Sequence, residues 1–379
     1  MHVINWQSVL SEHQVWTLRA FAALPGVELA IVSARDQLAE RQAQGWVRPE
    51  LSGLDVTPLP VHGWFAFGRR LIRANPGAHH LFCGLWADRR LFCLLLYAWW
   101  SGRKLALLTE PYSDSAHGLL RDQGIVLGRA KVIMRKTLYR IAGLLLGRRI
   151  SPLFAISHKA AIQFVRAGFR PQAICPFGYF VPRLPDIDAA QRARNDPLLR
   201  LVFIASLIRR KGLDILLQAL AMLPADEIAV SLDIFGPGNA DILPRDNPRV
   251  RYRGVIAFGE TQRVIANYDA LVVPSRFDGW SVVVNEALLQ GVPVLASTAT
   301  GAADMVQKQH AGFAFDPAAP EDLAKLIRRI AADRTLLDTA RERALAFRDR
   351  LAPELAARYM FDCFDSISRG VARPACPWY

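Results

Sequence analysis

The residues best suited to chemistry lie in the second half of the chain, where Asp278 and Glu286 stand eight positions apart. A strand-like run, residues 270–273, ends at Pro274, and a helical pattern begins near Ser281. The free N–H groups at such a helix start can bind an anion such as phosphate. A carboxylate more than one turn further along cannot face that anion without repulsion, but it can accept hydrogen bonds from neutral hydroxyls such as those of a ribose. One helix could therefore hold a nucleotide by phosphate and sugar together.

A plainer interpretation makes Asp278 an acidic turn residue and Glu286 an ordinary surface residue of the helix. The neighbours of Glu286, however, are nearly all apolar: Val282, Val283, Val284, Ala287, Leu288 and Leu289. A carboxylate among apolar side chains costs free energy unless it is satisfied, which favours a functional role.

Three consecutive cations, Arg209, Arg210 and Lys211, follow a strand-like run at residues 201–205 and precede Gly212 and a helical pattern. Cations just before a helix start act on the same anion as the free N–H groups, so they suit a phosphate, although a solvated basic turn would look the same. A loop of small residues at 297–303, which includes Gly301, follows the strand-like run 292–296. Small residues let a backbone approach a phosphate closely.

Taken together, these motifs resemble the family-4 glycosyltransferases. The family's Arg/Lys-Lys-Gly pattern matches residues 210–212, and its Glu-x7-Glu motif appears as Asp278 and Glu286 within residues 274–294. The resemblance is strong over about residues 200–305, and the first half is similar only in outline, at residues 155–157 and 176–181. It implies an α/β fold of the GT-B type, with two doubly wound Rossmann-like domains facing across a cleft.

The resemblance implies transfer of a sugar from a nucleoside diphosphate sugar with retention of configuration, and without a bound metal or other cofactor. Lys211 would stabilise the departing diphosphate, Asp278 would hold the donor sugar, and Glu286 would bind the ribose. The implied donor-binding set is Arg209, Arg210, Trp280, Ser281, Val282, Val283, Glu286 and Gly301. The acceptor would be a glycan or a lipid-linked precursor of a cell-surface polysaccharide. The base, the transferred sugar and the linkage stay open.

Two departures from the family pattern affect the site. Ser206 stands where many members have an arginine, a role that Arg209 or Arg210 could take. Members also often carry a histidine after a strand of the first domain, whereas the run 105–109 leads here into Glu110. Glu110 is therefore the candidate for that catalytic position, where an acid could orient a hydroxyl. A cap or loop acid is an equal alternative.

Two histidines of the first half are acceptor-binding candidates. His117 is the second choice after Glu110 for the missing histidine, and His13, which follows Ser11 at an expected helix start, could reach the cleft. A lone histidine is more often structural. Two other functions remain open: a nucleotide-sugar epimerase of the same fold, and a non-catalytic homologue that binds nucleotide sugars.

Alternating strand and helix patterns predict parallel sheets in two blocks, joined by the polar stretch 186–196. We expect an acceptor-binding domain at residues 1–185 and a donor domain at 186–353, with a C-terminal helix, about 354–379, packing back on the first domain. The scattered five cysteines, and the lack of a signal-like or 20-residue apolar run, predict a cytoplasmic location.

The net charge of +13 belongs to the first half, where residues 1–190 hold 23 Lys and Arg against 12 Asp and Glu. Segment 119–150 mixes basic and apolar residues at helical spacing, which predicts contact with an anionic membrane at the inner face. An ordinary amphipathic helix that packs in the first domain is an equal alternative. No nucleic-acid-binding module is recognisable, so nucleic acid is not an expected partner.

Overall fold

The computed structural model describes residues 1–35, 49–113, 125–185, 197–224, 228–240, 243–244, 247–257 and 259–379. The candidate His117 and the expected linker 186–196 lie outside these residues.

The central strands of the first sheet are buried along all or nearly all of their length. In the described part of the chain it has seven parallel strands in the order β3-β2-β1-β4-β5-β6-β7. The strands are β1 (His2–Gln7), β2 (Glu28–Ser33), β3 (Asp55–Pro58), β4 (His79–Cys83), β5 (Lys104–Thr109), β6 (Ile150–Ile156) and β7 (Ile174–Phe177). The chain order reverses between β1 and β4, which makes the carboxyl ends of these two strands the expected ligand crevice.

The second sheet repeats this arrangement with six described parallel strands in the order β10-β9-β8-β11-β12-β13. Its strands are β8 (Leu199–Ile204), β9 (Val230–Phe235), β10 (Val250–Tyr252), β11 (Ala270–Val273), β12 (Val294–Ser297) and β13 (Gly312–Phe315). Here the order reverses between β8 and β11, so the basic turn and the two-carboxylate loop both leave the sheet at its switch point. The predicted α/β class with two parallel sheets is confirmed.

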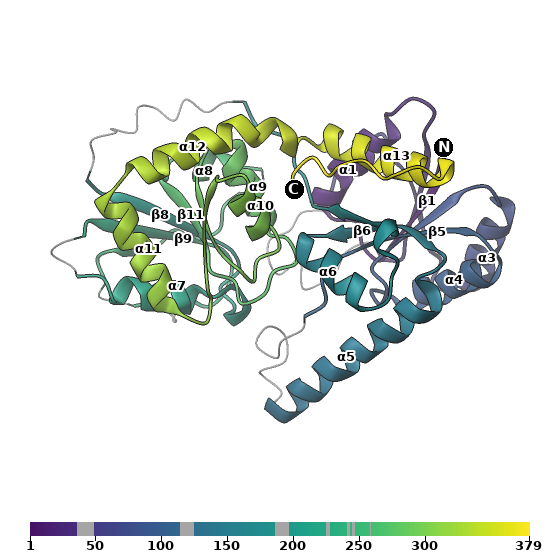
Figure 1. Ribbon diagram of the computed structural model, residues 1–379, viewed down its shortest axis with the longest axis horizontal. Coiled ribbons are helices and arrows are strands. Elements are labelled where there is room, and N and C mark those ends of the chain that lie inside the picture. Colours follow the sequence, from purple (N-terminus) through teal and green to yellow (C-terminus); the bar gives the residue numbers. More distant parts are fainter. Residues whose placement is uncertain are drawn as a thin grey trace.

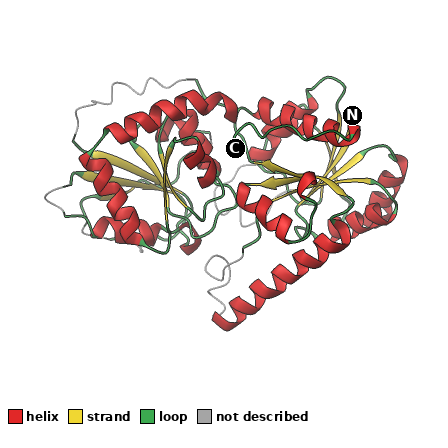
Figure 2. Ribbon diagram, viewed as in Figure 1, coloured by secondary structure: helices red, strands yellow, loops and turns green. Residues whose placement is uncertain are grey.

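Helices cover both faces of each sheet (Figures 1 and 2). The first unit contains α1 (Glu12–Ala22), α3 (Trp64–Ala74), α4 (Arg89–Trp100), α5 (Ile125–Leu146) and α6 (His158–Arg166). The second contains α7 (Leu213–Ala221), α8 (Thr261–Ile265), α9 (Val282–Leu289), α10 (Ala303–Lys308), α11 (Pro320–Ala332) and α12 (Thr335–Phe347). Figure 1 shows α5 as a long helix whose first turns project beyond the rest of the first unit.

The last helix, α13 (Pro353–Arg369), returns to the first unit and packs against α1. Phe364 of α13 is fully buried, and its ring centroid lies 5.4 Å from that of Phe154 and 6.3 Å from that of Phe21. Trp378, near the end of the chain, is also fully buried and lies 4.5 Å from Phe180. The C-terminal segment therefore belongs to the hydrophobic core of the first unit.

This packing predicts that Phe364→Ala lowers the free energy of unfolding by about 3–5 kcal/mol, because a large buried ring leaves a cavity. Urea unfolding followed by circular dichroism measures the change. The matched control is Phe65→Ala on α3, where the side chain is 39% exposed and the expected change is within about 0.5 kcal/mol. Equal losses in the two variants would contradict the assigned packing of α13.

Candidate functional site

A cavity of about 500 Å³ lies between the two units, at the carboxyl ends of β8 and β11. Its lining from the second unit includes Arg210, Lys211, Asp278 and Glu286. The first unit contributes His13 and Glu110. Residues 178–185, which follow β7 at the end of the first unit and are called the crossing segment below, contribute Tyr179 and Val181. The structure thus brings the predicted carboxylates and two of the predicted cations to one cavity that faces residues of the first unit.

The central polar contact is an ion pair in which Lys211 Nζ lies 2.6 Å from Asp278 Oδ2. Lys211 ends a short 3-10 turn, Arg209–Lys211, and Gly212 follows with a φ of 73°. A side chain at Gly212 would overlap the Pro274 carbonyl oxygen, so only glycine lets the basic turn approach the loop after β11. The close approach of the backbone at Gly212 to Pro274 therefore allows the short distance between Lys211 Nζ and Asp278 Oδ2.

The ion pair keeps the Asp278 carboxylate ionised. Burial alone raises the pKa of Asp278, but the nearby Lys211 ammonium and Arg210 outweigh burial and hold this pKa below its usual value. The carboxylate is buried, and its loop is fixed because the Asp278 N–H donates to the Ala299 carbonyl at 3.2 Å. A negative charge is thus held at a defined place at the cavity wall.

Of the other two cations in the basic turn, Arg210 lines the cavity and Arg209 does not. Arg210 lines the cavity, and its Nη1 donates to the Phe277 carbonyl at 3.0 Å. Arg209 is exposed and does not line the cavity, so its predicted place in the donor site is not supported by the geometry. Arg276, which sequence reasoning passed over, braces the turn through a 2.6 Å contact with Asp214.

The start of α9 is strained and open to the cavity. Ser281, directly before the helix, has a φ of 78°, which is uncommon for a residue other than glycine. Ser281, Val282 and Val283 line the cavity, as the anion-site prediction requires. The strain at Ser281 marks the turn as a feature that the surrounding structure maintains.

The Trp280 side chain has a structural role. It is 1% exposed, and its Nε1 donates to Asn285 Oδ1 at 2.9 Å. The Asn285 amide in turn donates to the Tyr179 carbonyl at 3.1 Å, and a side chain at Gly178 would collide with the indole ring. Trp280 therefore joins the second unit to the crossing segment. These contacts also hold Trp280 in place where it lines the cavity.

Glu286 is only partly exposed and lines the cavity from inside α9. Burial raises the pKa of its carboxyl from 4.5 to about 7, because desolvation disfavours the charged form. Neutral hydroxyl donors would relieve this cost, which agrees with a ribose-binding role.

Gly301 does not occupy the predicted position. It is buried and does not line the cavity, and a side chain there would overlap the Gly279 carbonyl oxygen. The close approach of Gly301 to a phosphate therefore stays a prediction, which the lining of this cavity does not support. Its small size instead lets the loop after β12 support the loop that carries Asp278.

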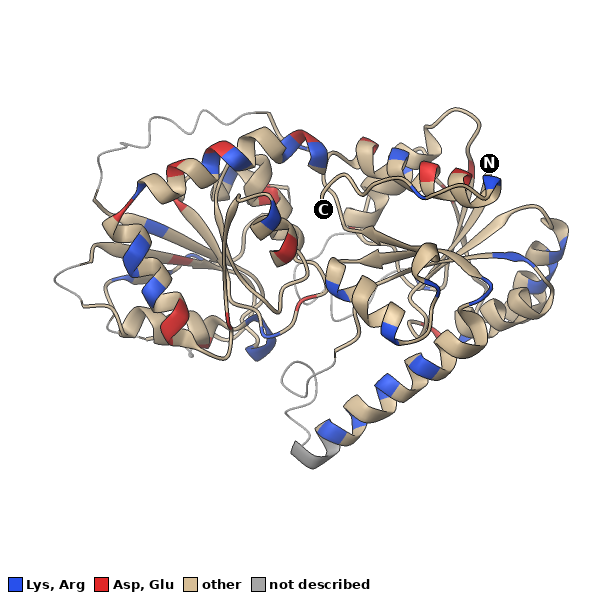
Figure 3. Ribbon diagram, in the orientation of Figure 1, with Lys and Arg blue, Asp and Glu red and all other residues tan. Residues whose placement is uncertain are grey.

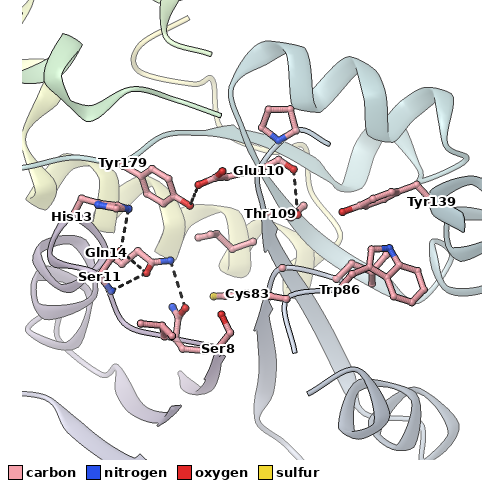
Figure 4. A pocket seen from close by; sticks show the side chains of 17 residues that line it. Ser8, Ser11, His13, Gln14, Cys83, Trp86, Thr109, Glu110, Tyr139 and Tyr179 are labelled. Atoms are coloured by element: carbon pink, nitrogen blue, oxygen red, sulfur yellow. Dashed lines mark hydrogen bonds between the residues drawn. The ribbon is translucent and has the colours of Figure 1, made fainter. Parts of the chain in front are cut away.

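On the first unit, Glu110 follows β5 and reaches the second unit. Its Oε1 accepts a hydrogen bond from the Tyr179 hydroxyl at 2.9 Å, and its carboxylate lies so near Gly279 that a side chain there would collide with it. The His13 ring lies 4.3 Å from the Tyr179 ring, and Figure 4 shows the three side chains in a row. Tyr179 was missed as a site residue, although it lies in the segment 176–181 that matched the family pattern in outline.

A second cavity, of about 380 Å³, lies beyond this row at the carboxyl ends of β1, β4 and β5 (Figure 4). It shares His13, Glu110 and Tyr179 with the larger cavity. No group of three or more His, Cys, Asp or Glu residues that could hold a metal ion occurs in the part of the chain that the structure describes.

The part of the chain that contains the basic turn and the two carboxylates is similar to known proteins. Residues 199–333 match the family glycosyl transferases group 1. The matched residues include Lys211, Asp278 and Glu286. A sulfoquinovosyl transferase of Arabidopsis thaliana, SQD2, is 33% identical over 129 residues, and a glycogen synthase of Mycobacterium tuberculosis is 30% identical over 176. These matches span 33% and 44% of this chain but only 25% and 41% of the two relatives.

Solved structures are similar to this chain over nearly its whole length. Anabaena HepE in complex with UDP covers 97% of this chain and 100% of its own, with a TM-score of 0.66 at 17% identity. The lipopolysaccharide outer core galactosyltransferase WaaB gives the same coverage and TM-score at 16% identity. The predicted GT-B fold is confirmed.

The raised pKa of Glu286 predicts a pH-dependent stability. The folded protein binds this proton more tightly than the unfolded chain, so ionisation of Glu286 destabilises the fold as pH rises from about 4.5 to 7, and the whole cost is present above pH 7. We expect Glu286→Gln, which is neutral throughout, to raise the Tm of the ligand-free protein more at pH 8 than at pH 5.

Differential scanning fluorimetry at the two pH values measures this effect. Glu342→Gln, at an exposed position of α12, is the matched control for loss of one negative charge. A Tm change for Glu286→Gln that is the same at both pH values would contradict the burial of an ionisable carboxyl at this place.

Proposed function

We propose that this protein is a glycosyltransferase that moves a sugar from a nucleoside diphosphate sugar to an acceptor with retention of configuration. The observation that carries this proposal is the Lys211–Asp278 ion pair in one cavity with Glu286, facing Glu110 of the other unit. A cation beside an ordered carboxylate suits a substrate that is anionic at its diphosphate and hydroxyl-rich at its sugar.

In this proposal Lys211 and Arg210 hold the diphosphate and stabilise the charge that develops on it as the bond to the anomeric carbon breaks. Asp278 and the backbone of residues 280–283 hold the donor sugar, and Glu286 accepts hydrogen bonds from the ribose. The acceptor hydroxyl attacks the anomeric carbon from the side of the leaving group, and its proton passes to the departing phosphate. Glu110, in hydrogen-bond contact with Tyr179, orients the acceptor.

We infer that UDP is the first nucleotide to test, since HepE structures contain UDP and UDP-glucose. A thermal-shift screen of UDP, GDP and ADP, each also as its glucose conjugate, measures binding. Product analysis with and without an acceptor then separates a transferase from an epimerase, which would convert the donor alone. Absence of a shift with every nucleotide would contradict the proposal.

Two variants test the assigned roles. We expect Lys211→Ala to lower turnover by on the order of 100-fold, because it removes a charge aimed at the leaving group. We expect Glu286→Ala mainly to weaken nucleotide binding, by about 10-fold or more, because it removes hydrogen bonds to a charged group. Steady-state kinetics and calorimetry separate the two effects. Transfer at the normal rate by both variants would show that the site is wrongly assigned.

We further propose that the protein acts at an anionic membrane surface through α5. Within α5, the residues Val132, Tyr139, Ala142 and Leu146 are buried against the first unit. At 3.6 residues per turn, an exposed apolar ridge lies opposite them. The ridge consists of Ile133, Met134, Leu138, Ile141, Leu144 and Leu145, which are 40–65% exposed.

Basic residues flank the ridge on both sides, Lys131 and Arg135 along one edge and Arg129, Lys136 and Arg140 along the other. Figure 3 shows blue residues on the projecting part of this helix and none on its last turns. An apolar stripe between rows of cations suits insertion among anionic lipid headgroups, where each cation contributes about 1 kcal/mol. No helix among the described residues is long and apolar enough to cross a membrane.

Vesicle sedimentation tests this surface. Replacing Arg135, Lys136 and Arg140 by Gln is expected to weaken binding to phosphatidylglycerol-containing vesicles by on the order of 100-fold. The matched control makes the same charge change on the other unit, at Lys325, Arg328 and Arg329 of α11, which are also exposed. Equal binding by the two triple variants would contradict a membrane role for α5.

A further inference from the structure

The two faces of the first sheet are covered by different sets of helices. Side chains alternate between the faces along a strand, and Leu153 and Ala155 of β6 pack in one apolar cluster with α3, α4, α5 and α6. Phe154 and Ile156 pack in another cluster with α1 and α13. Figure 1 shows α1 and α13 on one side of this sheet and α5 and α6 on the other. The four described helices α3 to α6 therefore form one layer, called the basic layer below.

The two layers differ in charge. The basic layer contains 12 Lys and Arg residues, and no Asp or Glu lies within the bounds of its four helices. The helices of the opposite layer, α1 and α13, together contain three basic and four acidic residues. Asp88, directly before α4, is buried and pairs with Arg90 at 3.0 Å. Figure 3 shows red residues on α13 and only blue charged residues on α5. The outer surface of the basic layer therefore suits an extended anionic partner.

A group of aromatic and apolar side chains lies on this layer apart from the exposed ridge of α5. On α4, Cys93, Leu96 and Trp100 are exposed, and Trp100 is 74% exposed. On α3, Phe65 is 39% exposed, and its ring centroid lies 5.8 Å from that of Tyr97. The Tyr97 ring lies in turn 6.4 Å from the Trp100 ring. Phe65, Leu96, Tyr97 and Trp100 are called the aromatic corner below.

Cations border the aromatic corner. The exposed basic residues of α3 are Arg69, Arg70 and Arg73. Arg73 Nε donates to the Tyr97 hydroxyl at 2.8 Å, which joins the cations of α3 to the rings of α4. Arg149, just after α5, donates to the Trp99 carbonyl at 2.6 Å, so the end of α5 lies beside the end of α4. The aromatic corner and the α5 ridge are therefore parts of the same outer surface.

This surface has the composition of a face that contacts lipid. Trp and Tyr are enriched where a membrane meets water, because their rings are apolar and their edges polar. Each cation near an anionic lipid surface contributes about 1 kcal/mol. Neither of the two cavities described above is lined by a residue of α3 or α4, so the exposed rings stand on an outer face and not in a pocket. A fluid layer of headgroups can contact rings and cations on several helices at once.

We propose that the basic layer as a whole faces an anionic membrane, and that the aromatic corner inserts among the headgroups as a second contact besides α5. Two contacts on one layer fix the orientation of the protein, whereas a single helix leaves it free to rotate about that helix. The first sheet then lies roughly parallel to the bilayer, and its carboxyl edge, where the smaller cavity lies, points along the membrane surface. The proposal deepens the proposed membrane role and rests on it for the contact through α5.

Cys93 offers a labelling position for the test, because it is exposed on α4 next to the aromatic corner, whereas Cys83, Cys175 and Cys363 are buried. In a Cys376→Ser background, Cys93 is labelled with the polarity-sensitive fluorophore NBD. We expect a blue shift and a rise in NBD emission on addition of phosphatidylglycerol-containing vesicles, because the label enters the headgroup region. Vesicles of phosphatidylcholine alone are expected to produce no shift.

The matched control carries the same label on the opposite layer. Ser368 is exposed on α13, so the label is attached at Ser368→Cys in a chain in which Cys93 and Cys376 are replaced by Ser. Its emission is expected to stay unchanged with both kinds of vesicle. Absence of a blue shift at Cys93, or an equal shift at the two positions, would overturn the proposal.

Vesicle sedimentation then measures the contribution of the exposed rings. Phe65→Ala combined with Trp100→Ala is expected to weaken binding to phosphatidylglycerol-containing vesicles about tenfold, because two rings that would be buried among headgroups are lost. The matched control is Leu345→Ala on α12 of the second unit, where the side chain is 41% exposed and no loss is expected. Equal binding by the two proteins would contradict insertion of the aromatic corner.

The cations of α3 are tested in the same assay. Arg69→Gln combined with Arg70→Gln is expected to weaken binding by on the order of tenfold or more, because each cation contributes about 1 kcal/mol. Arg328→Gln combined with Arg329→Gln makes the same charge change at exposed positions of α11 and is expected to leave binding unchanged. An equal loss in the two double variants would overturn the assignment of this surface.

The triple variant of α5, assayed in parallel, separates this proposal from the contact through α5. Weak binding by the α5 variant with normal binding by the variants of the aromatic corner and of α3 would leave the α5 contact standing and refute the second one. Loss in both sets would support a layer that binds as a whole. Loss only in the variants of the aromatic corner and of α3 would support the second contact and refute the contact through α5. The nucleotide thermal shift, measured without vesicles, tests the transferase proposal independently.

Discussion

The contact between Lys211 and Asp278 is the interaction on which the arrangement of the larger cavity depends. Its 2.6 Å distance requires the loop after β8 to meet the loop after β11, which only Gly212 permits. The loop after β12 fixes the backbone of Asp278, whose N–H donates to the Ala299 carbonyl and whose carbonyl accepts from the Gly301 N–H. The loops after three neighbouring strands therefore determine the geometry of one ion pair. Parallel strands make this convergence possible, because their carboxyl ends meet at a single edge.

The two cavities and the surface of α5 differ in the charged residues that they carry. The larger cavity has cations next to a fixed carboxylate, the smaller cavity has a carboxylate and neutral groups, and α5 carries the dense basic rows. Among the described residues, the cations of α5 thus lie on an outer surface, and neither cavity is lined by them. Sequence reasoning left two interpretations of segment 119–150 open, core packing and contact with lipid, because both predict apolar residues at helical spacing. The structure shows α5 with apolar residues on opposite faces, one buried and one exposed.

Several residues that line the larger cavity could be predicted from local motifs in the sequence. Lys211 and Asp278 lie in the loops that follow β8 and β11, and Glu286 lies in α9, the helix that follows β11, so their spacing in the sequence predicted their common place. Arg209 and Gly301 do not line the larger cavity, because turn geometry decides which of several neighbouring residues faces a cavity. Tyr179 was missed because its partner Glu110 lies 69 residues away, and no local pattern records such a contact.

The chain of contacts from Trp280 through Asn285 to Tyr179 has a mechanical consequence. It fastens the start of α9 to the segment on which the polypeptide crosses between the units, close to the cavity rather than at the periphery. A rotation of one unit relative to the other would have to break these contacts or pivot close to them, whereas the Lys211–Asp278 ion pair, which lies within the second unit, would move with that unit as a whole.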